Sequence, residues 1–395
     1  MFPYNAADLH ALLEELDTWK HLLDERAPLP RAWAGRLRRD LEAEAVAAST
    51  SMEGVPVTVE EVHRILAGDR PSTTTPEDAE LVRGYRDAMG FALRRADDPG
   101  FRWDRGLLVA LHDLILAGRF SEGAGRLRTA MAYVGNSATG ELIFTAAEPG
   151  EVPALTDEAM EVMQAGHPHP AIGAAWVHLA IAAIHPFRDG NGRTARISAS
   201  LAMLRGGSRL PEFTSLEEWW GRHLGDYYAS FGNLGSVFDP DVDVTAFIRN
   251  HIQAQLHQIR ALDLRERTQR QIWLVIEEAV DDAGLDARVA NAVWEGFFGR
   301  DVTSRYYREL VDVGEVTAAT DLKGTVAAGL LSAVGAGRGR HYVTGPDLYR
   351  LIGQRLGVDI DDGGEPARSQ LIAILIARAQ DSARRSHHLR SGAEE

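Results

Sequence analysis

Residues 170–205 read PAIGAAWVHLAIAAIHPFRDGNGRTARISASLAMLR, and this stretch decides how the centre of the fold is built. Positions 170–184 are apolar almost all round, so we predict a buried helix there. A glycine-rich loop follows at 185–192, and a helical pattern returns at 193–205. Ala, Leu, Arg and Glu are abundant throughout and runs of β-branched residues are scarce, so the chain as a whole is predicted to be mostly helical.

The loop carries groups that suit a polyphosphate. Pro186 cannot continue the first helix, and the glycines on both sides of Asn191 permit positive φ. Backbone N–H groups in such a loop, at the start of a helix, form a nest that binds anions. Arg193 and Arg196 are three residues apart on the second helix, so both point to one side and can hold phosphate oxygens.

Two further residues of the loop supply chemistry. Asp189 is a hard oxygen ligand near the same phosphates, as Mg²⁺ requires. His185 is the proton acceptor of the set that titrates near neutrality. A histidine before proline, a Gly-Asn-Gly turn or a pair of arginines is usually structural when it occurs alone. Their combination in one short segment indicates attack of a hydroxyl on a bound nucleotide.

The composition restricts the class of protein. Lys and Arg total 42 and Asp and Glu total 57, and the net charge of −15 disfavours general nucleic-acid binding, in which phosphate neutralisation dominates. Cysteine is absent, which excludes disulfides, thiolate metal sites and cysteine nucleophiles and leads us to expect a cytoplasmic protein. No apolar run of about 18 residues and no signal-peptide pattern is visible, so we expect no membrane span.

The remaining pattern predicts helices and one hairpin. Thr58 and Glu61 form a capping-box pattern at the start of a helix at 58–67. The segment 49–54, STSMEG, interrupts the preceding helical pattern. A β-hairpin at about 134–147 is either a plain surface loop or an edge that pairs with another chain. Further helices are expected at about 77–96, 103–117, 156–165, 216–231 and 242–280, with two more inside 7–48.

The segment His185–Arg196 resembles the signature of the Fic family, H-P-F-x-[D/E]-G-N-G-R-x-x-R, at every specified position. The family resemblance extends to Leu111-His112, to Gly125–Arg128 and to the pair Tyr227-Tyr228. It implies a mostly α fold, in which a Fic helical core with a β-hairpin flap is followed by a winged helix-turn-helix domain. The implied domains are an N-terminal helical region at 1–75, a Fic core at 76–235, connecting helices at 236–285 and a winged-helix-like domain at 286–395.

The resemblance also implies an activity, which is transfer of AMP from ATP to a Tyr, Thr or Ser hydroxyl of a target protein, with Mg²⁺. His185 would be the general base, and Asp189 would hold the metal. The target would dock on the flap near 134–147, although the flap lacks the Pro-Pro often seen after its second strand. The residues implied to bind the nucleotide are Asp189, Gly190, Asn191, Gly192, Arg193, Arg196, Tyr227 and Tyr228.

The segment 49–54 resembles the inhibitory motif of the same family, [S/T]-x-x-x-E-[G/N], in the class whose inhibitory helix precedes the core. Ser49, Glu53 and Gly54 occupy its fixed positions. Glu53 is then expected to pair with Arg196 and to occupy the place of the γ-phosphate of ATP. The alternative interpretation is a capped helix with a surface glutamate.

The C-terminal part reads as a helix, a turn, a second helix and a Gly/Arg-rich hairpin, which is a winged-helix pattern. The recognition helix would be Val316–Gly329, but Lys323 is its one base, so DNA binding is left open without being favoured. Docking of a protein or formation of a homodimer is at least as strong an expectation, because the chain is acidic.

Two other functions stay open at this point. The same site could remove AMP or transfer another nucleotide, with Glu53 orienting a water in the case of removal. The chain could instead be a nucleotide-sensing winged-helix regulator without catalysis, but a sensor has no use for the base His185. Modification of the chain's own hydroxyls is a further outcome that the pattern allows.

Overall fold

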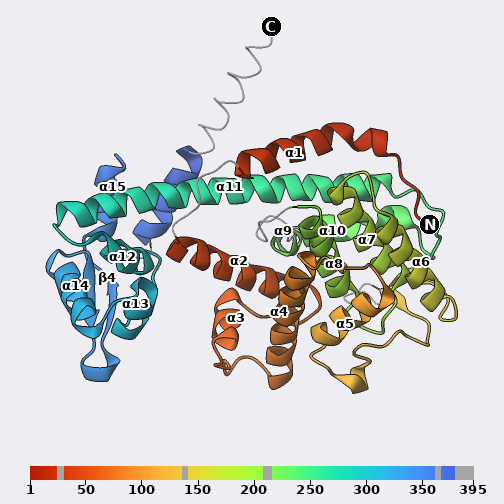
Figure 1. Ribbon diagram of the computed structural model, residues 1–395, viewed down its shortest axis with the longest axis horizontal. Helices are drawn as coiled ribbons and strands as arrows, with labels where there is room; N and C mark the ends of the chain where they lie inside the picture. The colour runs from red at the N-terminus through yellow and green to blue at the C-terminus, as the bar shows by residue number, and fades with distance from the viewer. Residues whose placement is uncertain (25–30, 136–140, 208–215, 361–365, 379–395) are drawn as a thin grey trace, which may run out of the picture. The chain divides into compact units, whose positions relative to one another are not determined.

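The computed structural model describes residues 1–24, 31–135, 141–207, 216–360 and 366–378, and in these ranges the chain is mostly helical with two small sheets (Figure 1). It divides into two compact units, Met1–Ile259 and Arg260–Glu395. No helix in the described ranges is long and apolar enough to cross a membrane.

The first unit holds the helices that surround the glycine-rich loop. Its α-helices are α1 (His10–Asp24), α2 (Arg31–Met52), α3 (Val59–Leu66), α4 (Pro76–Ala96), α5 (Arg105–Ile115), α6 (Val152–Ala165), α7 (Pro170–Ile184), α8 (Asn191–Arg205), α9 (Glu217–Arg222) and α10 (Leu224–Ser230). The helix α11 (Thr245–Asp282) begins in this unit and continues into the second. The described part of this unit also contains the short 3₁₀ turns η1 (Ala6–Leu9), η2 (Phe120–Glu122) and η4 (Gly232–Leu234).

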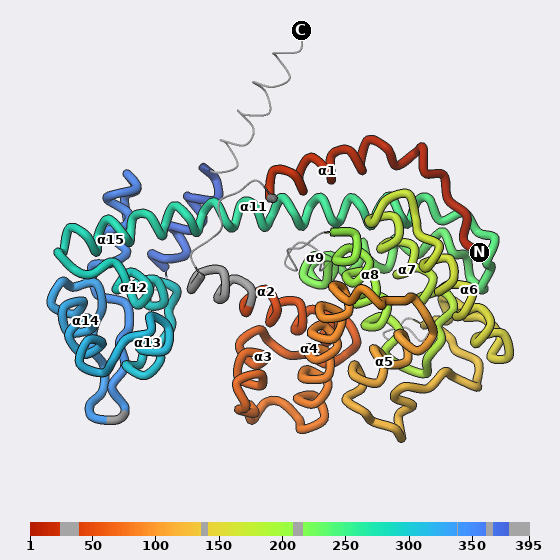
Figure 2. The backbone as a smooth tube through the Cα atoms, viewed as in Figure 1, coloured from red at the N-terminus to blue at the C-terminus, as the bar shows by residue number. Residues whose placement is uncertain are grey.

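The centre of the first unit is the pair α7 and α8, which pack along each other (Figure 2). Almost every residue of α7 is buried, including Trp176, so the predicted buried helix is confirmed. The helix α4 packs on α8 from another side, with Tyr85 fully buried. Both ends of the glycine-rich loop are therefore attached to helices that the core holds rigidly.

Local sequence sets several helix starts. The capping box of Thr58 and Glu61 forms at the start of α3, as predicted. Thr75 caps α4 just before Pro76, and Asp104 caps α5. These caps satisfy backbone N–H groups that a helix start otherwise leaves without partners.

Two expectations about helices were wrong in detail. The segment 49–54 was expected to interrupt the helical pattern, but α2 continues through it as far as Met52. Gly54, with φ of 83°, then turns the chain out of the helix. The helix expected at 216–231 is divided into α9 and α10 at His223. There the backbone leaves the helical region, with φ of −122° and ψ of 47°, while the ring Nδ1–H donates to Trp219 O.

The predicted hairpin is present. The strands β1 (Tyr133–Gly135) and β2 (Leu142–Thr145) pair antiparallel, and their connection at 136–140 lies outside the described residues. A parallel bridge joins Thr145 to Val237, which anchors one end of β2 to the chain that follows η4. The residues of β2 that precede this bridge are Leu142, Ile143 and Phe144.

The second unit contains α12 (Ala290–Phe297), α13 (Ser304–Val311), α14 (Glu315–Ala327) and α15 (Leu348–Arg355), with short turns η5 (Ala287–Val289) and η6 (Gly337–Gly339). The strands β3 (Leu331–Val334) and β4 (His341–Thr344) form an antiparallel hairpin. This order of elements agrees with the expected helix-turn-helix and hairpin, and the winged-helix fold itself stays a prediction. The expected recognition helix corresponds to α14, where Asp321 is buried and bound by Arg288 and Tyr307.

Candidate active site

The histidine of the loop lies in a strained backbone conformation. His185 follows the last residue of α7 and has φ of 54° and ψ of 59°, in the left-handed region that residues other than glycine seldom adopt. Its backbone N–H still donates to Ile181 O at 3.0 Å, so the residue both ends the helix and turns the chain. Such strain is retained where the surroundings enforce it, which is common at functional sites.

The ring of His185 is held in one tautomer. Its Nδ1–H donates to Ala182 O at 3.2 Å, because a carbonyl oxygen can only accept, and this leaves Nε2 with a free lone pair. The side chain is half-buried, and burial lowers its pKa below the ordinary histidine value. His185 is therefore neutral near pH 7 and presents a proton acceptor.

A buried arginine fixes the backbone around His185. Arg128 donates from Nε to His185 O at 2.6 Å and from Nη2 to Ile184 O at 3.2 Å. The same guanidinium donates to Ala147 O at 2.5 Å and to Ala130 O at 2.8 Å, next to the two strands of the hairpin. Arg128 thus connects the end of α7 with the base of the flap through hydrogen bonds to both.

A second brace comes from α5. His112 is fully buried, and its ring stacks on that of Phe187 with 3.8 Å between the ring centroids. It donates from Nε2 to Asp189 O at 2.9 Å. Its Nδ1 accepts from the Gly125 N–H at 3.1 Å, so both ring nitrogens are engaged. Burial lowers the pKa of His112 to about 4, and the neutral ring supports the loop without adding charge.

Within the loop, Asn191 acts on its own backbone. Its Oδ1 accepts from the Phe187 N–H and its Nδ2 donates to Phe187 O, both at 2.9 Å. Gly190 has φ of 73°, which glycine adopts without steric cost. The turn that was predicted from Gly190-Asn191-Gly192 is present, with the amide of Asn191 directed toward the loop, where its expected contact with the α-phosphate stays a prediction.

The structure brings Asp189 and Arg193 together. The two side chains form an ion pair at 3.5 Å, in which Asp189 is 59% exposed and Arg193 is 2% exposed. Arg193 Nε and Nη1 are buried and find no hydrogen-bond partner among the described residues. Buried donors without partners are uncommon, and they indicate a place where an anion can bind.

Arg196 is directed to a different set of partners. It donates from Nη2 to Glu53 Oε1 at 3.0 Å, and Glu53 is 20% exposed while Arg196 is 2% exposed. It also donates from Nε to Ser49 Oγ at 3.0 Å and from Nη2 to Ser49 O at 3.2 Å. The carboxylate of Glu53 lies so close to Gly192 that a Cβ there would collide with it.

The two tyrosines predicted near the nucleotide lie in different environments. Tyr227 is buried, and its hydroxyl accepts from Arg196 Nη1 at 3.4 Å and bonds to His178 Nε2 at 3.2 Å. Burial raises the pKa of Tyr227 to about 12, so its hydroxyl stays protonated. Tyr228 is 55% exposed and stays a candidate for contact with a ligand.

One metal ligand is offered by this site. The carboxylate of Asp189 is exposed next to the loop, and no group of three or more His, Asp or Glu side chains in the described ranges forms a metal site by itself. Mg²⁺ is often held by one carboxylate, with phosphate and water oxygens completing its octahedron. Asp189 therefore fits a metal that arrives with a phosphate ligand.

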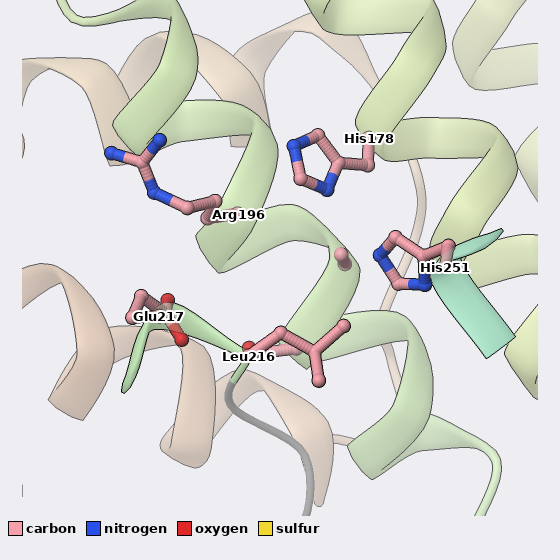
Figure 3. A pocket seen from close by; sticks show the side chains of 7 residues that line it. His178, Arg196, Leu216, Glu217 and His251 are labelled. Carbon is pink, nitrogen blue, oxygen red and sulfur yellow. The ribbon is translucent and has the colours of Figure 1, made fainter. Parts of the chain in front are cut away.

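Sequence reasoning missed the residues behind Arg196. A small cavity of about 10 Å³, which has room for roughly one water, adjoins its side chain (Figure 3). It is lined by His178, Arg196, Ala199, Ser200, Leu216, Glu217 and His251. Glu217 is 1% exposed, and a buried glutamate at the start of an ordinary helix carries no signal in a single sequence.

Comparison with known proteins identifies the domain that this site belongs to. Residues 102–203 match the Fic/DOC family, so the chain contains a Fic/DOC family domain. Over 143 residues the chain is 33% identical to protein adenylyltransferase fic-1 of Caenorhabditis briggsae and to that of Caenorhabditis elegans. The match covers 33% of this chain and 24% of either relative, so the chain spans about a quarter of their length.

Solved structures show the same fold. A Fic family protein from Desulfovibrio desulfuricans G20 is 20% identical with a TM-score of 0.57, and the alignment covers 87% of this chain and 98% of that one. Fic-1 from C. elegans is 22% identical with a TM-score of 0.51, covering 65% of this chain and 71% of that one. The described chain therefore has a mostly helical Fic fold with small two-stranded sheets.

Proposed function

We propose that this protein is an adenylyltransferase that transfers AMP from ATP to a hydroxyl side chain of a protein. The observation that carries the proposal is the placement of a neutral His185, with Nε2 free to accept a proton, at one end of a glycine loop whose other end presents two buried arginines. The Fic/DOC match and the 33% identity to an adenylyltransferase over a third of the chain support it.

The binding of ATP is assigned to the loop and the start of α8. The backbone N–H groups around Gly190 and Gly192 would receive the α- and β-phosphates. Arg193, whose Nε and Nη1 have no partner in the described ranges, would take the β-phosphate. Arg196 would take the γ-phosphate in place of the Glu53 carboxylate.

The reaction then requires a single proton acceptor. The oxygen of the target hydroxyl forms a bond to the α-phosphorus, and its proton passes to His185 Nε2. The bond between the α-phosphorus and the oxygen that bridges to the β-phosphate breaks, and pyrophosphate leaves. Arg128 keeps His185 in place by donating to its carbonyl oxygen. The base is therefore already oriented before the reaction, which lowers the activation free energy of the transfer.

Mg²⁺ is expected to bind together with ATP. Asp189 would hold it through the exposed carboxylate. When bound, the ion neutralises charge that develops on the phosphate oxygens. Since Asp189 pairs with Arg193 in the structure, binding of the metal would release Arg193 toward the phosphates.

The position of Glu53 supports auto-inhibition. Its carboxylate forms the ion pair with Arg196 and lies against Gly192, where the proposal puts phosphate. Ser49 in the last turn of α2 accepts a further bond from Arg196, and Gly54 ends that helix with positive φ. ATP and the carboxylate therefore compete for one guanidinium.

The target is proposed to dock at the flap. Tyr133, Leu142 and Ile143 are exposed on its two strands, and among the described residues the outer edge of β2 is bridged at Thr145. An extended segment of a protein can add to such an edge by backbone hydrogen bonds. Hydroxyls of the chain itself, of a second copy in a homodimer or of another protein are all candidate acceptors, while DNA stays an unfavoured partner of the second unit.

The proposal is tested with two differently labelled forms of ATP. The purified chain is incubated with Mg²⁺ and ATP that carries label either on the α- or on the γ-phosphate, with and without cell lysate. We expect label on protein from the α-form and none from the γ-form, with pyrophosphate released. Label from the γ-form alone would indicate a phosphotransferase, and label from neither form, after Glu53 is also replaced, would refute the assignment.

Replacement of Asp189 by alanine is expected to lower Mg²⁺-dependent transfer on the order of 10²-fold, because the metal loses its protein ligand. Mn²⁺ is expected to replace Mg²⁺ in the wild type, since both accept octahedral oxygen ligands. Initial rates with either ion are compared with rates in excess chelator. Asp226→Ala, an exposed carboxylate on α10, is the control. Transfer that survives in chelator would contradict the metal role.

A further inference from the structure

The buried positive charge of Arg196 is balanced by Glu53 only while the two side chains are paired. The guanidinium is buried, and a buried charge without a partner strongly destabilises a fold. In the competition proposed above, the guanidinium has neither of these partners whenever Glu53 has left and ATP has not yet bound. Another group is then needed to balance its charge.

A second acidic side chain shares a cavity with Arg196. Glu217, at the start of α9, is 1% exposed, and Tyr85 from α4 donates its hydroxyl hydrogen to Glu217 Oε1 at 2.7 Å. Arg196 and Glu217 line the same small cavity (Figure 3). Burial opposes the charge on Arg196, yet the neighbouring Tyr227, Glu53, Tyr85 and Glu217 together raise its pKa.

Hydrogen bonds from neighbouring helices hold both side chains in place. Arg196 donates from Nε to Ser49 Oγ at 3.0 Å. Glu217 Oε1 accepts from the hydroxyl of Tyr85. The guanidinium and the carboxylate are therefore both fixed at the cavity that they line.

The two histidines among the described residues that line the cavity add no charge to it. Burial lowers the pKa of His251 to about 3, and burial also lowers that of His178 far below its ordinary value. Both rings are therefore neutral near pH 7. Of the seven described lining residues, Arg196 and Glu217 are the two with a basic or acidic side chain other than histidine.

We propose that Glu217 is the permanent counter-charge of Arg196 and positions its guanidinium when Glu53 has left and no phosphate is bound. Glu53 and the γ-phosphate then alternate as partners of the guanidinium. Glu217, held by Tyr85, is present throughout. This deepens the regulation proposed above and rests on it, because release of Glu53 is the event that makes the second carboxylate necessary.

The test is a double-mutant cycle on the full chain. Thermal midpoints are measured for wild type, Glu53→Gly, Glu217→Gln and the double variant, with and without ATP. Each single variant keeps one carboxylate. We therefore expect the double variant to lose at least about 3 °C more in its thermal midpoint than the two single variants lose together, which corresponds to a coupling of about tenfold. ATP is expected to raise the midpoint of the double variant more than that of either single variant.

Matched variants separate this role from a merely structural one. Glu218→Gln, next on the same helix and paired with Arg222, is expected to be additive with Glu53→Gly. In an Arg196→Gln background the coupling between Glu53 and Glu217 is expected to vanish. Glu217→Asp, which keeps the charge, is expected to restore part of the lost midpoint. If Glu217→Gln does not fold, Tyr85→Phe takes its place in the cycle with the same sign expected.

Two results would overturn the inference. The first is additivity of Glu53→Gly and Glu217→Gln, and the second is coupling that persists without Arg196. Neither readout requires transfer of AMP. A chain that shows the coupling but never transfers label would therefore refute the proposed function and leave the counter-charge in place.

Discussion

Replacement of His185 by alanine is expected to reduce AMP transfer by about 10²–10⁴-fold while ATP still binds. The residue has its Nδ1–H engaged by Ala182 O, so Nε2 is the acceptor that the loop offers to a hydroxyl. The groups assigned to phosphate, such as Arg193 and Arg196, come from α8 and are not altered by the change.

Rates of label transfer are compared with ATP affinity measured by calorimetry on the same preparations. Because His185 lies in the left-handed region, His185→Asn is a second variant, since asparagine tolerates that conformation and cannot act as a base. Transfer near the wild-type rate in either variant, with folding intact, would remove His185 from the role of base.

The pH profile gives an independent view of the same residue. A base acts in its neutral form, so transfer should fall as the pH drops through the pKa of His185. Burial lowers that pKa, and the plateau of activity is therefore expected to extend below the ordinary titration range of histidine. The acid limb is expected to be absent from the residual activity of His185→Ala.

Replacement of Glu53 by glycine is expected to raise self-labelling and target labelling by roughly one to two orders of magnitude. The carboxylate forms a charge-assisted bond to Arg196 at 3.0 Å in a largely buried place. Hydrogen bonds to charged groups contribute about 1.5–3 kcal/mol each, and each 1.4 kcal/mol is about tenfold in the population of the open site.

The experiment compares wild type, Glu53→Gly, Arg196→Ala and the double variant at equal ATP concentration. Arg196→Ala should not reproduce the activation, because the γ-phosphate loses its anchor together with Glu53. The double variant should be inactive for the same reason. Equal rates for wild type and Glu53→Gly would show that residues 49–54 only end a helix.

The local parts of the site were predictable from the sequence. The apolar run at 170–184, Pro186 and the glycines on both sides of Asn191 determine a buried helix, a turn and a new helix, because each acts on its immediate neighbours. The chemistry of His185, Asp189 and the two arginines follows from residue type and spacing. The family match at 102–203 agrees with that segment.

Other features needed the tertiary structure, because the partners are far apart in the chain. Glu53 and Arg196 are separated by 143 positions, and the motif at 49–54 predicted their pairing only through a family resemblance. That motif was also misplaced relative to its helix, since the continuation of α2 to Met52 depends on packing that no local pattern records.

By itself the sequence determined which residues could do chemistry: a base, a metal ligand, a phosphate nest and two arginines within residues 185–196. The tertiary structure decided how they are held. Arg128 joins that loop to the flap, and His112 supports it from α5. Glu217 lies behind Arg196 although 132 positions separate it from its partner Tyr85. A buried charge must be balanced wherever the chain brings a partner near, and that is a property of three-dimensional packing rather than of local sequence.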